Sequence, residues 1–242
     1  MDENQINWVT VEPGSVLVGS DNRSILFGGI GPRHEVSIGY QYRISTRPLD
    51  FEELSRIEYN SSMEIVSDSE WELAYSRGLL SGAEGSSESL ADSTQDYWGK
   101  PCDGRPFVSG NNSPKLIRRW KSGKAQTLTV FPNRTTEAPI SDGIRVVVRE
   151  HSGWSENPPT IPKRRNHSKV IIEEILICLI VGILPSFVWA FFNARQGYIR
   201  DGWLNLVLGG IFLSMFTMIF WRPRQSTWHI DSDRMILQEG KR

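Results

Sequence analysis

The residues that could carry metal or redox chemistry are few and scattered. Cys102 stands in a polar Gly/Pro-rich loop and Cys178 in an apolar run, so no disulfide between them is expected. Because Cys102 has no neighbouring histidine, it is expected to be an inert thiol rather than a nucleophile. The histidines are His34, His151, His167 and His229. Since none has a second histidine nearby in sequence, we predict no metal site, and we interpret His34 as a packed strand residue.

Two strongly apolar stretches, 170–192 and 203–221, dominate the second half of the chain. Each is long enough to cross a bilayer core, which needs roughly 20 helical residues, and aromatic residues lie near their ends. The alternative is a pair of buried core helices. We expect two membrane spans joined by a short loop, with Pro185 kinking the first.

The basic residues around these stretches predict their orientation. The flanks carry Lys163, Arg164, Arg165, Lys169, Arg222, Arg224 and Arg234, whereas the connecting loop carries Arg195 and Arg200. By the positive-inside rule, both flanks and both termini are expected in the cytoplasm. The lipid bilayer is then the first predicted partner. Glu173 and Glu174 are expected to reach the interface beside Lys169.

The segments that border the spans have their own signatures. Residues 151–169 form a proline-interrupted basic linker, which separates a soluble domain at 1–150 from the first span. Residues 222–242 are expected to be a cytoplasmic tail, in which Trp228 and Ile230 face Met235 and Leu237 across a polar turn. This alternation predicts a short β-hairpin, which is marginal alone and would pack on a neighbour or stay loose.

The soluble domain at 1–150 reads as mixed α+β. Short alternating runs separated by Gly/Pro turns predict strands, as in "HEVSIGYQYRIS" and "GIRVVVRE". One helix is expected to begin after the N-cap Asp50. Another is expected in "SDSEWELAYSRG", with Ser67 as N-cap, Glu70 completing a capping box and Gly78 ending the helix.

Four landmarks in this domain occur in a characteristic order. "NWVTVEPGSVLVGS" opens the chain, "GPRHEVSIGYQYRISTRPLDFEEL" follows, then "DSEWELAYSRG", and finally "GIRVV". The order resembles the formylglycine-generating enzymes, or sulfatase-modifying factor domains, over about residues 6–149. The matching positions, which we call the signature residues, are Trp8, Gly14, Gly19, His34, Glu70, Trp71, Gly143 and Arg145. The resemblance implies an irregular C-type-lectin-like α+β fold, in which Trp8 and Trp71 need buried acceptors for their indole N–H and the glycines stand at sharp turns.

The resemblance also implies a chemistry that this chain lacks the residues to perform. Catalytic members bind copper through two cysteines near the end of the domain, whereas the corresponding stretch, 116–147, contains none. Thiolates are the ligands that hold Cu(I), so no catalytic residue and no cofactor is predicted. The family's calcium-binding segment is also not recognisable. A loose calcium site at Asp103 and Asn111 is left open without further support.

We therefore interpret the chain as a membrane-anchored, catalytically inactive relative that serves as a binding or scaffold module. The loop at 81–112 is the predicted binding surface for an unknown protein or small-molecule ligand, through Tyr97, Trp98, Arg105 and Phe107. An alternative is that Trp98 and Phe107 fold this loop over its own core.

Two other functional hypotheses remain open: a divergent metal-dependent enzyme of the same family, and a subunit of a larger membrane complex. The basic stretch 115–124 is either a solvated strand face or a contact for anionic lipid headgroups. No nucleic-acid partner is predicted.

Overall fold

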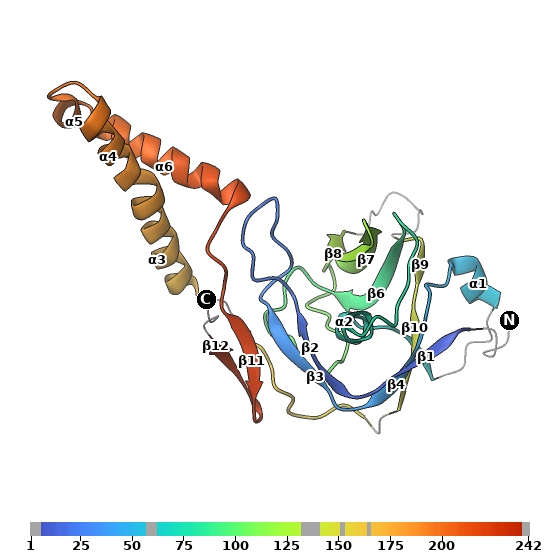
Figure 1. Cartoon of the computed structure of the whole chain (residues 1–242). Coiled ribbons are helices and arrows are strands. Elements are labelled where there is room, and N and C mark those ends of the chain that lie inside the picture. The colour runs from blue at the N-terminus through green and yellow to red at the C-terminus, as the bar shows by residue number, and fades with distance from the viewer. Residues whose placement is uncertain (1–5, 57–61, 132–140, 151–152, 164–165, 239–242) are drawn as a thin grey trace. The chain divides into compact units, whose positions relative to one another are not determined.

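A computed structural model describes residues 6–56, 62–131, 141–150, 153–163 and 166–238 (Figure 1). The chain forms two compact units. The first comprises Met1–Asp21, Gly29–Lys163 and Ser226–Arg242, and the second comprises Asn22–Gly28 and Arg164–Gln225. The first unit is mixed α+β, and the second contains two long apolar helices, as the sequence predicts. His151, Arg164 and Arg165 lie outside the described residues.

Three four-stranded sheets form the frame of the first unit within the described residues, in the orders β1-β4-β10-β5, β12-β11-β3-β2 and β8-β7-β6-β9. The strands are β1 (Trp8–Val11), β2 (Gly14–Val18), β3 (His34–Ile38), β4 (Gln41–Ser45), β5 (Met63–Ile65), β6 (Ser87–Ser93), β7 (Lys115–Lys121), β8 (Lys124–Val130), β9 (Gly143–Ile144), β10 (Val146–Glu150), β11 (Thr227–Asp231) and β12 (Arg234–Gln238). Most neighbours pair antiparallel, whereas β6 with β9 and β11 with β3 pair parallel. The specific C-type-lectin-like fold remains an expectation.

The main core lies where the sheets meet the helix α2 (Asp68–Ser76), which packs against β2 and β6 (Figure 1). Its fully buried members include Val11, Val36, Ile44, Trp71, Leu116 and Val147. A smaller cluster contains Leu49, Met63, Ile144 and Val146, against which Trp8 packs. Alternate residues of the strands supply these side chains, because successive side chains on a strand point to opposite faces.

The two short helices of the first unit begin where the sequence predicts. The hydroxyl of Ser67 accepts the Glu70 backbone N–H, and the Glu70 carboxylate accepts the Ser67 N–H, so the capping box at α2 is confirmed. Helix α1 (Phe51–Arg56) follows Asp50, whose carboxylate accepts the Glu53 N–H at 2.6 Å. Each cap satisfies backbone donors that the first helical turn leaves without a partner.

The chain returns to the first unit after the helices. β11 pairs antiparallel with β12 and parallel with β3. In the parallel pair Trp228 is in register with His34, and the Trp228 backbone N–H donates to the Arg33 carbonyl at 3.0 Å. The strands thus lie where the sequence predicts a hairpin. They do not form a separate tail, because they extend a sheet of the N-terminal domain.

The proline-interrupted segment is also part of the first unit. At 153–163 it runs beside residues 99–102: the Cys102 N–H donates to the Pro159 carbonyl at 2.8 Å, and the Ile161 N–H donates to the Lys100 carbonyl at 3.1 Å. The Ile161 side chain is completely buried in the main core. The predicted linker of 151–169 therefore needs correction, because Ile161 anchors much of it to the domain.

The second unit contains a helical hairpin. Its first arm joins α3 (His167–Ile177), the π-helical segment η2 (Cys178–Ile183) and α4 (Leu184–Asn193). The short helix α5 (Tyr198–Asp201) precedes the second arm, α6 (Trp203–Phe220), which lies beside η2 and α4 (Figure 1). Both arms are long and apolar enough to cross a membrane, and only 17% of the most apolar window of each is buried.

Small residues allow the two arms to approach closely. A Cβ atom on Gly182 would lie 2.1 Å from the Gly210 carbonyl oxygen, and one on Gly210 would lie 2.6 Å from the Ile183 Cα. Gly210 and Ser214 are buried at this crossing. The π-helical segment ends immediately before α4, whose first turn contains Pro185. The local helical geometry therefore changes beside the proline, which lacks the N–H that a regular helix needs there.

Candidate functional site

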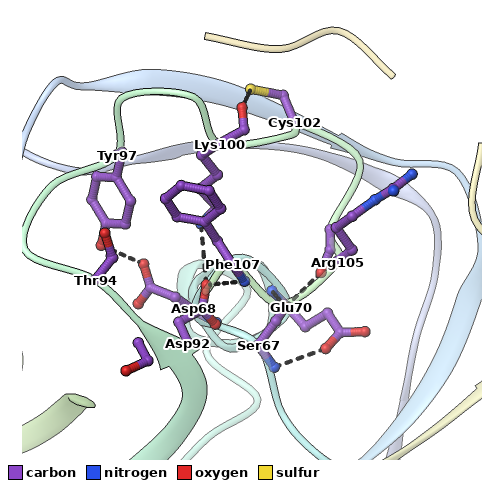
Figure 2. Close-up of polar contacts among 12 residues, drawn as sticks. Ser67, Asp68, Glu70, Asp92, Thr94, Tyr97, Lys100, Cys102, Arg105 and Phe107 are labelled. Carbon is purple, nitrogen blue, oxygen red and sulfur yellow. Dashed lines mark hydrogen bonds and ion pairs between the residues drawn. The ribbon is translucent and has the colours of Figure 1, made fainter. Parts of the chain in front are cut away.

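A buried network of charged groups lies at the N-terminus of α2, between β6 and the segment 94–107 (Figure 2). Asp68 accepts a hydrogen bond from Arg118 Nη2 at 2.6 Å and another from the Tyr97 hydroxyl at 2.6 Å. Asp92 accepts the backbone N–H groups of Asp68 at 2.7 Å and Phe107 at 3.0 Å. Asp92 therefore fixes the start of α2 and the 94–107 segment to the same strand.

Lys100 completes this network without a hydrogen-bond partner among the described residues. Its Nζ lies 3.8 Å from Asp92 Oδ1, which is an ion-pairing distance beyond hydrogen-bonding range, and 4.7 Å from the centroid of the Tyr97 ring. The Lys100 and Asp92 side chains are completely buried. The ammonium group is therefore held by charge and by the aromatic ring face.

Burial and charge shift the acids in opposite directions. Burial raises the pKa of Asp92 to about 6, and the attraction of Lys100 offsets only part of this effect. Burial also acts on Asp68, but the charges of Arg118 and Lys100 outweigh it and hold the pKa below its ordinary value. Burial raises the pKa of Tyr97 well above its ordinary value, which keeps the hydroxyl protonated as a donor to Asp68. These groups are paired inside the protein rather than directed at solvent.

Two further buried ion pairs contain signature residues. Arg145 pairs with Glu88 and donates to the carbonyls of Ser45 at 3.0 Å and Ser81 at 2.6 Å. Glu88 also accepts the Trp120 indole N–H at 2.9 Å. Arg145 therefore connects β9–β10 to three separate segments of chain.

Glu70 forms the second pair. Its carboxylate accepts Arg149 Nε at 2.6 Å and the Tyr40 hydroxyl at 2.7 Å, in addition to its capping bond. A single glutamate thus holds the helix start, the end of β10 and the β3–β4 turn.

The remaining signature residues are structural, with one departure from expectation. His34 is completely buried, its Nδ1 lies 2.9 Å from the Pro32 carbonyl, and burial lowers its pKa to about 3. Trp8 is half-buried and packs on the smaller core. Trp71 is completely buried, but the predicted acceptor for its indole N–H is not found among the described residues. The Trp71 ring contacts the Arg118 guanidinium, whose carbon atom lies 4.4 Å from the ring centroid.

The signature glycines serve two purposes rather than one. Gly19 has a φ of +86°, as a sharp turn requires. At Gly143 the constraint is space, because a Cβ would lie 2.4 Å from the Leu49 carbonyl oxygen. At Gly14 a Cβ would lie 2.4 Å from Arg77 Nη2, which is the end of a flexible side chain and can move. A positive φ occurs at Gly19 and not at Gly14 or Gly143, each of which begins a strand directly after a bend in the chain.

The predicted binding loop is folded onto the domain. Tyr97 is buried in the network described above, whereas Trp98 and Phe107 are half-buried. Trp98 contacts Trp228 edge-on, with ring centroids 6.4 Å apart. Of the two interpretations that the sequence leaves open, the structure favours the loop that packs over its own core. Tyr97 therefore needs correction as a surface contact.

Arg105 belongs to a half-buried cluster that the sequence does not reveal. Its guanidinium carbon lies 5.5 Å from the Trp154 ring centroid, Arg149 lies 5.6 Å from the same centroid, and the Tyr40 ring meets Trp154 edge-on at 5.5 Å. We call Tyr40, Arg105, Arg149 and Trp154 the aromatic–arginine patch. Trp154 lies in the predicted linker, where its aromatic character in a segment that also contains Pro158 and Pro159 is the one sequence signal.

Of the two residues left open as calcium ligands, Asp103 has another partner. Both Asp103 oxygens accept bonds from Arg105, and Asn111 lies in an exposed turn. Cys102 is buried, and burial raises the pKa of its thiol to about 12. Among the residues that the structure describes, no three His, Cys, Asp or Glu side chains gather in an arrangement that could hold an ion.

The basic stretch 115–124 divides between core and solvent. Arg118 and Trp120 point inward from β7 and pair with Asp68 and Glu88, whereas Arg119 and Lys121 are exposed. The interpretation as a solvated strand face therefore needs correction at Arg118, which is buried and paired with Asp68, whereas contact of the exposed Arg119 and Lys121 with anionic lipid headgroups stays a prediction.

A second polar cluster closes the base of the helical hairpin. Arg23 donates to Glu173 at 2.6 Å and also pairs with Glu174. Arg222 Nε donates to Glu174 at 3.2 Å, and its Nη2 donates to the Ser214 carbonyl at 3.1 Å. The sequence places the two glutamates beside Lys169, but their partners in the structure are Arg23 and Arg222, which come from distant positions.

Comparisons with known proteins find no counterpart: no family model, no curated protein and no solved structure matches the chain. The resemblance to sulfatase-modifying factor domains therefore rests on the sequence landmarks alone.

Proposed function

We propose that this protein is a membrane-anchored binding module, in which an α+β domain of sulfatase-modifying-factor type scaffolds a protein partner at the cytoplasmic face of a membrane. The observation that carries the proposal is that the chain re-enters the α+β domain after the helical hairpin, because β11 follows the hairpin and pairs with β3. The hairpin is thus an insertion within the domain, with both ends fixed to one folded unit. Both flanks must lie on one side of the membrane, in agreement with their basic residues.

The exposed apolar surface of the two helical arms supports their placement in lipid. Core helices of a soluble protein are covered, whereas these arms leave most of their apolar surface open. Their pairing through Gly182 and Gly210 is typical of membrane helices, in which close backbone approach replaces a hydrophobic driving force.

The polar interior supports a binding role over catalysis. Asp68, Asp92 and Lys100 are enclosed: Asp68 pairs with Arg118 and Tyr97, and Asp92 pairs with Lys100 and with two backbone N–H groups. A catalytic acid or base must reach its substrate. We therefore infer that these charges hold the 94–107 segment in place so that the domain presents a rigid surface.

The aromatic–arginine patch is the proposed contact surface. Trp, Tyr and Arg are the residue types that dominate binding energy at protein interfaces. Here Trp154 is half-buried, and its ring is held by Arg105 and Arg149, so binding a partner would cost little conformational entropy at this side chain.

Affinity purification from native membranes with mass spectrometry of co-eluting proteins tests this proposal. A specific partner should be recovered with the natural chain and reduced at least several-fold by Trp154→Ala. The matched control is Phe51→Ala, which removes an exposed aromatic residue elsewhere on the domain. Equal recovery with both variants would contradict the patch as the contact surface. Stoichiometric copper or iron in the purified protein would favour the divergent-enzyme alternative.

A further inference from the structure

The segment Asn22–Gly28 belongs to the helical unit although it lies between β2 and β3 in the sequence. We call it the apolar finger. The backbone N–H groups of Ile25 and Leu26 donate to the carbonyls of Met218 at 3.1 Å and Ile219 at 3.0 Å. These carbonyls lie in the last turn of α6, where a helix leaves its carbonyl groups without internal partners. The finger and the helix therefore satisfy each other's backbone groups.

The finger also satisfies its own polar groups. Asn22 Nδ2 donates to the Phe27 carbonyl at 3.0 Å, Asn22 Oδ1 accepts the Ser24 N–H at 3.0 Å, and Ser24 Oγ accepts the Phe27 N–H at 3.2 Å. In a medium with little water each unsatisfied backbone group is costly, so this arrangement suits the edge of a bilayer.

The side chains at the tip face outward. Ile25, Leu26 and Phe27 are 67%, 58% and 65% exposed. Three consecutive large apolar residues in this state are unfavourable in water, in contrast to scattered apolar residues, which are ordinary on protein surfaces. They require an apolar occupant.

Neighbouring surfaces identify that occupant as lipid. The finger is bonded to the end of one proposed span, and Arg23 holds it to Glu173 and Glu174 at the start of the other. Around these anchors the arms expose further apolar side chains, including Ile171, Ile172, Phe220 and Trp221. The apolar surface of the finger is thus continuous with the surface that the proposed hairpin presents to the bilayer.

We propose that the apolar finger inserts its tip, Ile25–Phe27, into the interfacial region of the same membrane leaflet that receives the base of the hairpin, as a third membrane-binding element. The inference rests on the proposed membrane anchoring. It assigns to the finger a partner of defined chemistry, the boundary between lipid headgroups and acyl chains. Arg23 acts as a positioning residue, because its two ion pairs fix the finger at that depth.

Site-specific fluorescence in liposomes tests the insertion. The full chain with Cys178→Ala would carry Phe27→Cys, labelled with an environment-sensitive dye and reconstituted in phosphatidylcholine–phosphatidylglycerol vesicles. Phe212→Cys, at an exposed position on α6, is the embedded control, and Gln126→Cys, at an exposed position on β8, is the aqueous control. Cys102 is buried and is not expected to react.

The label at position 27 should be quenched by lipids that carry a shallow spin label several-fold more than the label at 126, and less by aqueous iodide. Adding Arg23→Gln should reduce the lipid quenching at 27 and leave that at 212 unchanged. Quenching at 27 equal to that at 126, with lipid quenching retained at 212, would overturn the finger proposal alone. Protection from iodide without lipid quenching would overturn it too, in favour of contact with a second copy of the chain. Loss of lipid quenching at 212 as well would overturn membrane anchoring itself.

Discussion

Replacing Arg145 with methionine should destabilise the domain more than any exposed arginine substitution. The guanidinium is completely buried, pairs with Glu88 and donates to carbonyls of three further residues. Arg145→Met retains much of the stem but leaves the Glu88 carboxylate buried with the Trp120 indole as its remaining side-chain donor in the described structure. Removing one partner of such a pair costs about 3–5 kcal/mol.

Thermal unfolding of the full chain in detergent, followed by tryptophan fluorescence, measures this effect. For a chain of this size each kcal/mol moves the melting temperature by roughly 2–4 °C, so a loss on the order of 10 °C is expected. The matched control is Arg56→Met, which removes a pair with Glu52 in which both side chains are more than half exposed, and it should shift the melting temperature by about 2 °C or less.

The double variant separates the ion pair from general disturbance. Adding Glu88→Gln to Arg145→Met removes the stranded charge and should recover part of the loss, so that the two substitutions are not additive. Equal shifts for Arg145→Met and Arg56→Met, or strict additivity with Glu88→Gln, would refute the reasoning.

Three further outcomes follow from the geometry. Because burial lowers the pKa of His34 from 6.5 to about 3, the unfolded chain binds a proton here below pH 6.5 that the folded chain does not, so this residue should lower stability by about 1.4 kcal/mol per pH unit as pH falls from 6.5 toward 3. The raised pKa of Asp92 acts in the opposite direction below about pH 6, so the test is the difference between variants: His34→Gln should lose less melting temperature on acidification than the natural chain, and an unchanged slope would contradict the assignment. Gly182→Leu should separate the helical arms and lower protease resistance of the hairpin in detergent, whereas Gly209→Leu, with open space around its Cβ position, should not; equal effects would contradict close packing at Gly210. Maleimide at pH 8 should leave Cys102 unmodified in the folded chain and label it after denaturation, as mass spectrometry of the adducts would reveal; rapid labelling of the folded chain would contradict its burial.

Features encoded within a few neighbouring residues were predictable from the sequence. The capping box of Ser67 and Glu70 depends on residues three positions apart, and the apolar arms are recognisable by length alone. In each case the physical cause acts along one element, so that the local pattern is sufficient.

Features that depend on distant partners were not predictable. Tyr97 and Lys100 lie in a stretch rich in Gly, Ser and Asp that resembles an exposed loop, but Asp68 and Arg118 draw it inward from other elements. Ile161 lies in a proline-rich segment, and its burial likewise depends on distant residues of the main core. The periodicity of a sequence indicates which secondary structure each segment prefers. It does not indicate which charged side chains meet across the core.

The pairing of β11 with β3 also orders events during synthesis. A ribosome translates β3 first and β11 only after both arms of the hairpin have been made, so the edge of β3 waits unpaired while the apolar helices emerge. Completion of that sheet therefore requires that both helices have been made, and a nascent chain stalled within the hairpin keeps an open strand edge, which is a template for pairing with another chain.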